Sequence, residues 1–184
     1  MTPDFSKTNW KNHQILKQKP TKVFLSLGSN LGDREQSLER AIECLQVRDE
    51  NQILHLSSLY ETEPVDCLTG GWFLNQVIQL VTLFSPKQLL DQLQALERRL
   101  GRVKQEINGP REIDIDILFF GDEIIAEPHL QIPHPRLHER RFVLEPLNEL
   151  NPQIWHPLYN KTVQTLLTEA PEATVQRVAP ALIN

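Results

Sequence analysis

Apolar and polar residues alternate in the first hydrophobic segment of the chain, which predicts a β-strand over residues 22–27. One face of this strand carries three aliphatic side chains, those of Val23, Leu25 and Leu27. A glycine-containing turn over residues 28–32 follows, and then Asp33 and Gln36 stand three positions apart, as in a helix-capping box. Apolar residues at helical spacing after Asp33 predict a first helix.

The same patterns continue along the chain and set the fold class. They predict strands near residues 53–60 and 73–83, separated by a long loop over residues 61–72. Ser85 and Pro86 are typical of a helix start, and Gly101 is expected to end that helix. A strand through residues 113–118, a short strand at 123–126 and helices at 142–150 and 162–170 complete the prediction, with Pro146 expected to break the first of these helices at its start. The order strand-helix-strand-strand-helix-strand is that of a ferredoxin-like split βαβ unit, an α+β fold with a mostly antiparallel sheet and helices packed on its faces.

Composition narrows the class of protein. The 184 residues, 40% hydrophobic and 23% charged, predict a single domain over residues 21–184, preceded by a polar extension at residues 1–20. The net charge of −5 argues against a nucleic-acid-binding surface, and no segment is apolar and long enough to cross a membrane. Cys44 and Cys67 suit neither a zinc site nor a disulfide framework, so we expect a reducing, cytoplasmic location. We also expect a monomer or a weak homodimer.

The segment with the clearest chemical content is Gly-Pro-Arg-Glu-Ile-Asp-Ile-Asp-Ile, residues 109–117. In a strand, Asp114 and Asp116 point to the same face while the isoleucines point to the other. Neighbouring carboxylates repel each other unless a positive group lies between them, and Mg²⁺ is commonly held by one or two carboxylates together with substrate phosphates. The pair therefore predicts a metal site for a phosphorylated substrate, although a solvated strand face is the common alternative for an isolated Asp-x-Asp.

Basic side chains flank this acidic strand in the sequence. Arg102, Lys104 and Arg111 precede it, and His134, Arg140 and Arg141 follow it. A nucleoside triphosphate with its metal needs both kinds of group, because carboxylates hold the metal while arginines hold the phosphate oxygens. Phe73, Asn75 and Phe142 could likewise form a slot for a flat heterocycle, with core packing as the alternative for the two phenylalanines.

Several motifs in a fixed order give the chain a specific resemblance. They are Leu-Gly-Ser-Asn-Leu-Gly at 27–32, Ser-Leu-Tyr-Glu-Thr-Glu-Pro at 58–64, Phe-Leu-Asn at 73–75, Leu-Gly-Arg-Val-Lys at 100–104, the Gly-Pro-Arg segment running to 118, Pro-His-Pro-Arg at 133–136 and Arg-Arg-Phe at 140–142. With these motifs, the chain from residue 23 to its last helix resembles the 6-hydroxymethyl-7,8-dihydropterin pyrophosphokinases of folate biosynthesis.

This resemblance implies a reaction and a set of residue roles. The reaction is transfer of pyrophosphate from ATP to the hydroxymethyl group of the pterin, giving the pterin diphosphate and AMP. The resemblance implies that Asp114 and Asp116 hold two Mg²⁺ ions and that Arg102, Lys104 and Arg111 take part in catalysis. It assigns the pterin to Thr62, Val65, Phe73, Asn75 and Phe142, and it assigns ATP to Gln94, Glu97, Arg102, Lys104, Arg111, His134 and Arg140.

One departure from the family pattern leaves alternatives open. Many members carry an arginine and an aromatic residue just before Gly-Pro-Arg, where this chain has Ile107 and Asn108. A pterin- or nucleotide-binding module with weak catalysis is therefore one alternative. Another is a different Mg²⁺-dependent nucleotidyl or phosphoryl transferase that uses the same two carboxylates.

Overall fold

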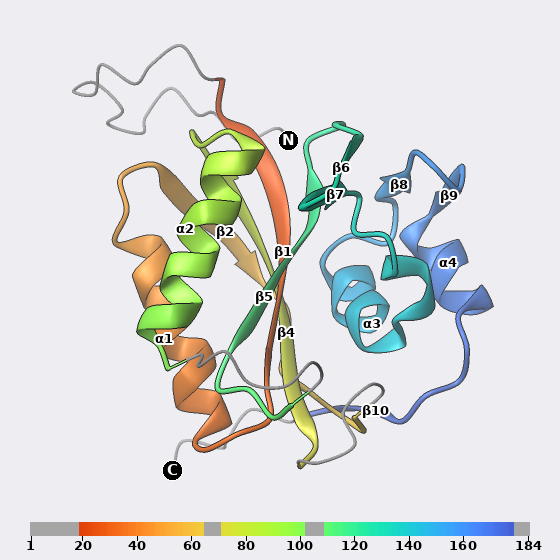
Figure 1. Cartoon of the computed structure of the whole chain (residues 1–184). Coiled ribbons are helices and arrows are strands. Elements are labelled where there is room, and N and C mark those ends of the chain that lie inside the picture. The colour runs from red at the N-terminus through yellow and green to blue at the C-terminus, as the bar shows by residue number, and fades with distance from the viewer. Residues whose placement is uncertain (1–18, 65–70, 102–108, 179–184) are drawn as a thin grey trace.

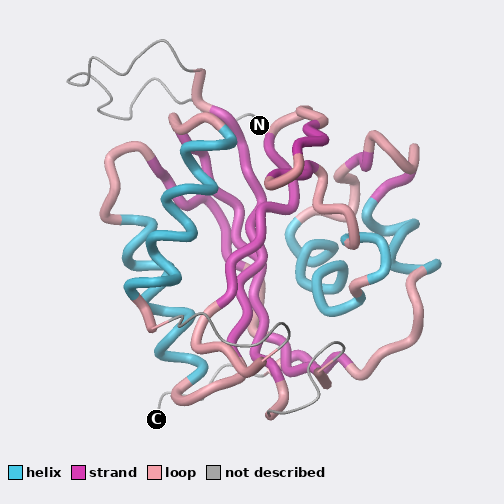
Figure 2. Tube along the Cα trace, in the orientation of Figure 1, coloured by secondary structure: helices cyan, strands magenta, loops and turns pink. Residues whose placement is uncertain are grey.

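A six-stranded antiparallel sheet separates two layers of helices in the computed structural model (Figures 1 and 2), which describes residues 19–64, 71–101 and 109–178. Five of the six strands of the sheet and the first helix layer are formed by β1 (Thr21–Ser29), α1 (Arg34–Gln46), β2 (Asn51–Leu56), β3 (Tyr60–Thr62), β4 (Phe73–Thr82), α2 (Pro86–Arg99) and β5 (Asp114–Phe120). The remaining elements are β6 (Ile125–Glu127), β7 (Leu130–Ile132), a 3₁₀ turn (Leu137–Glu139), α3 (Arg141–Leu150), β8 (Trp155–His156), β9 (Lys161–Thr162), α4 (Val163–Glu169) and β10 (Val175–Arg177).

The strand order places β1 between β4 and β5. The sheet runs β10-β3-β4-β1-β5, and β2 also pairs with β4. Every pairing in this described sheet is antiparallel. With β2 and β3 sharing one position beside β4, the arrangement is the predicted ferredoxin-like one, and that prediction of fold class is confirmed.

Two helix pairs cover the two faces, α1 and α2 on one side and α3 and α4 on the other (Figure 1). Side chains at alternate positions of β1 belong to different cores: Leu25 and Leu27 pack with the first helix pair and Phe24 packs with the second. This alternation follows from the strand period of two.

Both long helices begin with the predicted caps. The Asp33 carboxylate accepts a hydrogen bond from the backbone of Gln36 at 3.0 Å. Ser85 and Gln88 form a reciprocal capping box at α2, with Pro86 in the first helical position. Gly101 follows α2 with φ of +108°, a left-handed conformation that glycine adopts without a steric penalty.

The structure corrects three predicted boundaries. The strand expected at residues 53–60 is split into β2 and β3, and β3 continues to Thr62 inside the expected loop. Pro146 lies in the interior of α3 rather than at its start, because burial of Val143, Leu144 and Leu147 stabilises the helix despite the lost backbone donor. The short strand expected at 123–126 is β6, at Ile125–Glu127, which pairs with β7.

The predicted extension lies almost wholly outside the described residues, so its boundary stays a prediction. Within the described ranges, no helix combines the length and the apolar character needed to cross a membrane.

Candidate active site

The two aspartates lie on the face of the sheet that α3 and α4 cover. In β5, Asp114 pairs with Gly28 and Asp116 pairs with Ser26 of the central strand. Ile115 and Ile117 point into the core beneath α1 and α2. The predicted alternation of the segment is therefore confirmed, and both carboxylates remain partly exposed, at 24% and 37% of their side-chain surface.

Each aspartate has its own arginine. An Arg111 Nη1 hydrogen donates to Asp114 Oδ2 at 2.6 Å, and Arg140 Nη1 donates to Asp116 Oδ2 at 3.2 Å. The arginines reach the strand from opposite directions in sequence, Arg111 from the segment before β5 and Arg140 from the residue before α3. The structure thus brings four of the predicted site residues into two ion pairs on one strand face, which balances the negative charge of neighbouring carboxylates.

His134 lies beside the second pair. Its Nε2 atom is 3.4 Å from Arg140 Nη1 and 3.8 Å from Asp116 Oδ2. Burial, together with the positive charge of Arg140, lowers the pKa of His134 to about 4. The imidazole is therefore neutral at physiological pH and adds no third positive charge to this cluster.

A glycine lies between the aspartates and the predicted pterin residues. Gly28 is in register between Asp114 on β5 and Asn75 on β4. A Cβ atom at Gly28 would lie 2.9 Å from Asn75 Oδ1 and 3.7 Å from the Phe73 ring. Because glycine carries no side chain, the Asn75 amide can lie directly over the backbone of this strand.

The Asn75 amide has a fixed orientation. Its Nδ2 donates to Thr62 Oγ1 at 2.8 Å, and both residues are buried. Thr62 in turn pairs with Phe73 across β3 and β4. Three of the predicted pterin residues therefore lie together at the end of two neighbouring strands, with the Asn75 amide held by Thr62.

Phe142 reaches this region from the other layer. It is in the first turn of α3, which packs against β3 and β4. The Arg140 guanidinium lies 5.6 Å from the centre of the Phe142 ring, within the range of a cation–π contact. This arginine therefore contacts both the metal-site candidate Asp116 and the pterin-slot candidate Phe142.

Two predicted ATP residues lie on α2, beneath the opposite face. Glu97 is buried, and its Oε1 accepts the backbone N–H of Ile115 at 2.8 Å. Glu97 thus holds the strand segment between the two aspartates, a structural contact that sequence reasoning did not anticipate. Gln94 is exposed one turn earlier on the same helix.

Two further residues position the site and were missed in the sequence. The backbone N–H of Asn30 donates a hydrogen bond to the Arg111 carbonyl oxygen at 3.0 Å, and Asn30 Oδ1 accepts one from the Arg111 backbone N–H at 2.7 Å. Arg34 donates to the Trp72 carbonyl at 2.8 Å and to Glu61 Oε1 at 2.6 Å. Only their position after the Gly-Ser motif could have indicated them, since their partners are 27 or more positions away.

Three predicted site residues, Val65, Arg102 and Lys104, lie outside the described residues. Among the residues that the structure describes, no group of three or more His, Cys, Asp or Glu side chains could hold a metal ion. The aspartate pair can still fit Mg²⁺, because this ion is commonly bound by one or two carboxylates with water and substrate phosphates as its other ligands. Both side chains are oxygen donors, share a face and are accessible.

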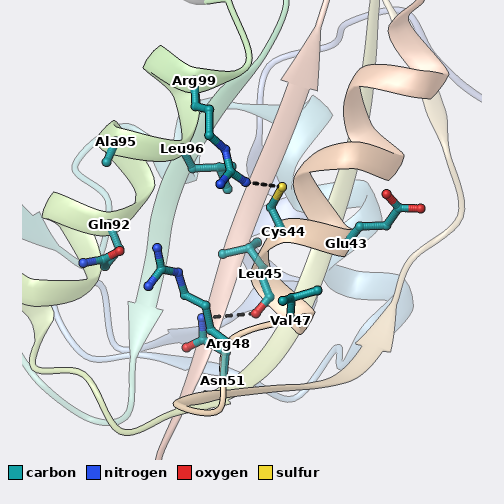
Figure 3. Close-up of a pocket in the computed structure, with 10 residues that line it drawn as sticks. All are labelled: Glu43, Cys44, Leu45, Val47, Arg48, Asn51, Gln92, Ala95, Leu96 and Arg99. Carbon is teal, nitrogen blue, oxygen red and sulfur yellow. Dashed lines mark hydrogen bonds between the residues drawn. The ribbon is translucent and has the colours of Figure 1, made fainter.

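A cavity of about 610 Å³ lies away from these residues, between α1 and α2 (Figure 3). Its lining includes Cys44, Arg48, Gln92 and Arg99, and none of the predicted site residues. Arg99 Nη2 donates to the Cys44 sulfur at 2.5 Å across the gap between the helices.

Comparisons with known proteins identify relatives of the chain. The model of the family described as 7,8-dihydro-6-hydroxymethylpterin-pyrophosphokinase (HPPK) matches residues 24–152. The 2-amino-4-hydroxy-6-hydroxymethyldihydropteridine pyrophosphokinase of Bacillus subtilis is 41% identical over 132 residues, 72% of this chain and 79% of that protein. The protein of the same name from Aquifex aeolicus is 40% identical over 147 residues, 80% of this chain and 91% of that protein.

Longer relatives match as well. The folic acid synthesis protein fol1 of Pneumocystis carinii is 39% identical over 160 residues, 87% of this chain. The chain spans only 22% of the length of that protein. Wild-type Plasmodium falciparum HPPK-DHPS, a solved structure, has a TM-score of 0.68 at 18% identity, with 84% of this chain and 45% of that chain covered, which is a likeness of fold.

Proposed function

The chain belongs to the 7,8-dihydro-6-hydroxymethylpterin-pyrophosphokinase family, and from that premise we propose that it transfers pyrophosphate from ATP to the hydroxymethyl group of 6-hydroxymethyl-7,8-dihydropterin. The products are the pterin diphosphate and AMP, and the reaction belongs to folate biosynthesis. The observation that carries the proposal is the pair Asp114 and Asp116 on one strand face, each with an arginine, in register across Gly28 with Asn75. The motifs that predicted this activity fall within the matched residues 24–152.

The proposed reaction forms one bond and breaks one. The pterin hydroxyl oxygen bonds to the β-phosphorus of ATP and loses its proton, while the bond from the β-phosphorus to the α,β-bridging oxygen breaks. AMP leaves with that oxygen. Charge grows on the leaving oxygen, so catalysis depends mainly on positioning and on nearby positive groups.

Asp114 and Asp116 are the proposed holders of two Mg²⁺ ions. When bound, the ions would stabilise the attacking and leaving oxygens and reduce the charge of the phosphates. In the structure, both carboxylates already carry a positive partner. We infer that Arg111 and Arg140 turn from these carboxylates to phosphate oxygens when ATP is bound, since guanidinium groups pair well with both.

The other proposed ATP contacts are Gln94, Glu97, Arg102, Lys104 and His134. Support for His134 comes from its place beside Arg140 and Asp116. A neutral imidazole, with a pKa of about 4, has one donor and one acceptor nitrogen. It can therefore donate to a phosphate oxygen, or exchange hydrogen bonds with the adenine base, without adding charge.

The proposed pterin slot lies between the sheet and α3. Phe73 and Phe142 would stack on the two faces of the ring, and Asn75, Thr62 and Val65 would contact its edge. The fixed Asn75 amide supports this role, because the buried site would then present a defined donor and acceptor to the heterocycle. We place the enzyme in the cytoplasm as a monomer or weak homodimer.

One assay tests the activity. The protein is incubated with ATP, Mg²⁺ and 6-hydroxymethyl-7,8-dihydropterin, and the nucleotides are separated. AMP that forms only when the pterin is present supports the proposal. ADP would point to an ordinary kinase, pyrophosphate release to a nucleotidyl transferase, and ATP binding without any product to a binding module in which Ile107 and Asn108 have replaced catalytic residues.

A further inference from the structure

Glu149, near the end of α3, makes a contact set that the proposed reaction does not use. Its carboxylate accepts hydrogen bonds from four donors: Ser58 N at 3.0 Å, Ser58 Oγ at 2.8 Å, Tyr60 OH at 2.9 Å and Arg177 Nη2 at 3.1 Å. Burial alone would raise the pKa of Glu149, but the hydrogen bonds from Ser58 and Tyr60 outweigh that effect and lower the pKa. The group is therefore held as a carboxylate with its donors converging on it.

These donors come from two parts of the chain that are far apart in sequence. Ser58 lies in the break between β2 and β3, Tyr60 begins β3, and Arg177 belongs to β10. Arg177 also donates from Nε to Ser58 Oγ at 2.8 Å, which closes the network. Strand β10 pairs with β3 along Tyr60–Thr62, at the lower edge of the sheet in Figure 1. Glu149 thus joins α3 to the strand pair β3–β10.

The two elements that Glu149 joins carry the two sides of the proposed pterin slot. Phe142 and Glu149 are seven residues apart in one helix, which places them on the same face, two turns from each other. On the other side, Tyr60 pairs with Asn75, and Thr62 pairs with Phe73. A shift of α3 relative to β3 would change the separation between Phe142 and the Phe73–Asn75 side of the slot.

We propose that Glu149 is a positioning residue that fixes the width of the pterin slot by holding α3 against β3 and β10. This role rests on the proposed function, and it extends to Ser58 and Arg177 as partners of the same carboxylate. The described hydrogen-bond partners of Glu149 are Ser58, Tyr60 and Arg177, none of which is a proposed substrate contact, so we expect an indirect effect on the pterin side that α3 and β3 form. On the ATP side, Asp114, Asp116 and Arg111 are held by other contacts, those of Glu97 and Asn30. Arg140 alone among the described ATP candidates directly precedes α3, and it is also held by its ion pair with Asp116.

The substitution Glu149→Gln tests the role with little change of shape. Whichever way the amide is turned, its NH₂ group faces either Arg177 Nη2 or the Ser58 backbone N–H, and neither can accept a hydrogen bond. We expect KM for the pterin to rise about tenfold, the consequence of losing roughly one charge-assisted hydrogen bond. KM for ATP and kcat should change less than KM for the pterin, because Asp114, Asp116 and Arg111 lie outside α3 and Arg140 is also held by Asp116.

A matched control and a second variant keep the test decisive. Glu169→Gln removes a carboxylate at the end of α4 that accepts from Lys161 Nζ at 2.6 Å, and it should leave both KM values unchanged. Arg177→Gln should raise KM for the pterin as well, but by less than Glu149→Gln does. This variant still tests the role if Glu149→Gln does not fold. Thermal unfolding of each variant separates lost structure from lost affinity.

The outcomes separate this inference from the proposed function. If the unsubstituted protein produces AMP but both Glu149→Gln and Arg177→Gln bind pterin as well as it does, the positioning role is wrong and the activity stands. An equal rise of both KM values, or a fall of kcat alone, would also contradict it. If the unsubstituted protein produces no AMP, the proposed function fails, and direct pterin binding by fluorescence still tests the slot.

Discussion

On β5, Ile115 and Ile117 face the helices α1 and α2, whereas Asp114 and Asp116 face the side of α3, one residue away in each case. The same contrast is present on the central strand, where Leu25 and Leu27 are fully buried among aliphatic side chains and Gly28 leaves room for the polar Asn75 side chain. One face is filled by interdigitating aliphatic side chains. The other is filled by α3 and α4 along only part of its length, and its remaining part is polar.

Within a single strand, the residues on one face therefore contribute mainly to stability and those on the other face to the proposed chemistry. A filled face stabilises the fold through burial, at about 25 cal/mol for each Å² of apolar surface removed from water. The polar end of the other face holds charged groups whose partners are hydrogen-bonded neighbours rather than packed carbons. We therefore expect substitutions on the two faces to change different measurable quantities.

The largest expected effect belongs to the polar face. Replacing Asp116 by Ala should reduce turnover by on the order of 10³-fold, as when one preorganised electrostatic group is removed from an active site. The melting temperature should fall only modestly, because the Asp116 carboxylate is partly exposed, although its loss removes an ion-pair partner of Arg140. The measurement is AMP formation at saturating ATP and pterin, beside thermal unfolding.

A surface carboxylate provides the control for that variant. Asp91 on α2 is exposed and pairs with Lys87 at 3.8 Å, so Asp91→Ala should keep full activity. Unchanged turnover in Asp116→Ala would remove the metal assignment from β5.

The filled face gives the second effect, on stability alone. Leu93 of α2 is fully buried, and Leu93→Ala should lower the free energy of unfolding by about 2–5 kcal/mol. Activity measured well below the melting temperature should be retained. The matched variant Leu144→Ala on α3 should destabilise similarly but also raise KM for the pterin, since α3 carries Phe142.

Urea unfolding and steady-state kinetics, measured on the same samples of Leu93→Ala and Leu144→Ala, check these two expectations. A rise in pterin KM of equal size in both variants would contradict the separation of the two faces.

Gly28 gives a third, smaller effect. In Gly28→Ala the added methyl group would lie 2.9 Å from Asn75 Oδ1, too close without displacement of the amide. We expect KM for the pterin to rise about tenfold, since overpacking of this kind typically costs about 1–3 kcal/mol. Gly71→Ala is the control, because its nearest neighbour is the Asn30 carbonyl at 4.0 Å. Pterin binding equally tight in both alanine variants would show that the slot does not depend on the position of the Asn75 amide.

Local signals in the sequence predicted those parts of the fold that local physics determines. The Ser85–Gln88 capping box, the Asp33 cap and the alternation through Asp114 and Asp116 each depend on residues within four positions of one another. The strand pairing followed from the order of the elements. These are the features that the structure confirms.

The missed features depend on partners far apart in sequence or on very short strands. The sequence pattern predicted a single strand where the structure has β2 and β3. Ser57 lies between them, and its side-chain Oγ, rather than a backbone carbonyl, accepts the Val77 N–H at 3.0 Å. Strands β8, β9 and β10 have two or three residues, too few for a periodic pattern. The Glu149–Ser58 contact spans 91 positions, and nothing near either residue indicates it.

The last expected effect, which is small within any one pH unit, concerns stability at mildly acidic pH. His156 is fully buried against Phe119 and Tyr159, and neither ring nitrogen has a hydrogen-bond partner within the described part of the chain. Burial and the nearby His138 lower the pKa of His156 to about 4, whereas in the unfolded chain it is near 6.5. Between these values the unfolded state binds more protons, so stability falls as pH drops from 6.5 toward 4. One such proton contributes at most about 1.4 kcal/mol per pH unit.

Urea unfolding over this pH window, compared between two variants, isolates the contribution of His156. His156→Phe keeps an aromatic ring against Phe119 but removes the titrating group, so the slope of stability against pH should decrease by about that one-proton amount. A slope from His134 remains, because burial lowers its pKa to about 4 as well. The exposed His129 gives the control, and His129→Phe should leave the slope unchanged. If His156→Phe also leaves the slope unchanged, His156 accepts a proton in the folded state as readily as in the unfolded one. The layer between the sheet and the helices α3 and α4 would then not be the closed, apolar layer that the contacts of His156 indicate.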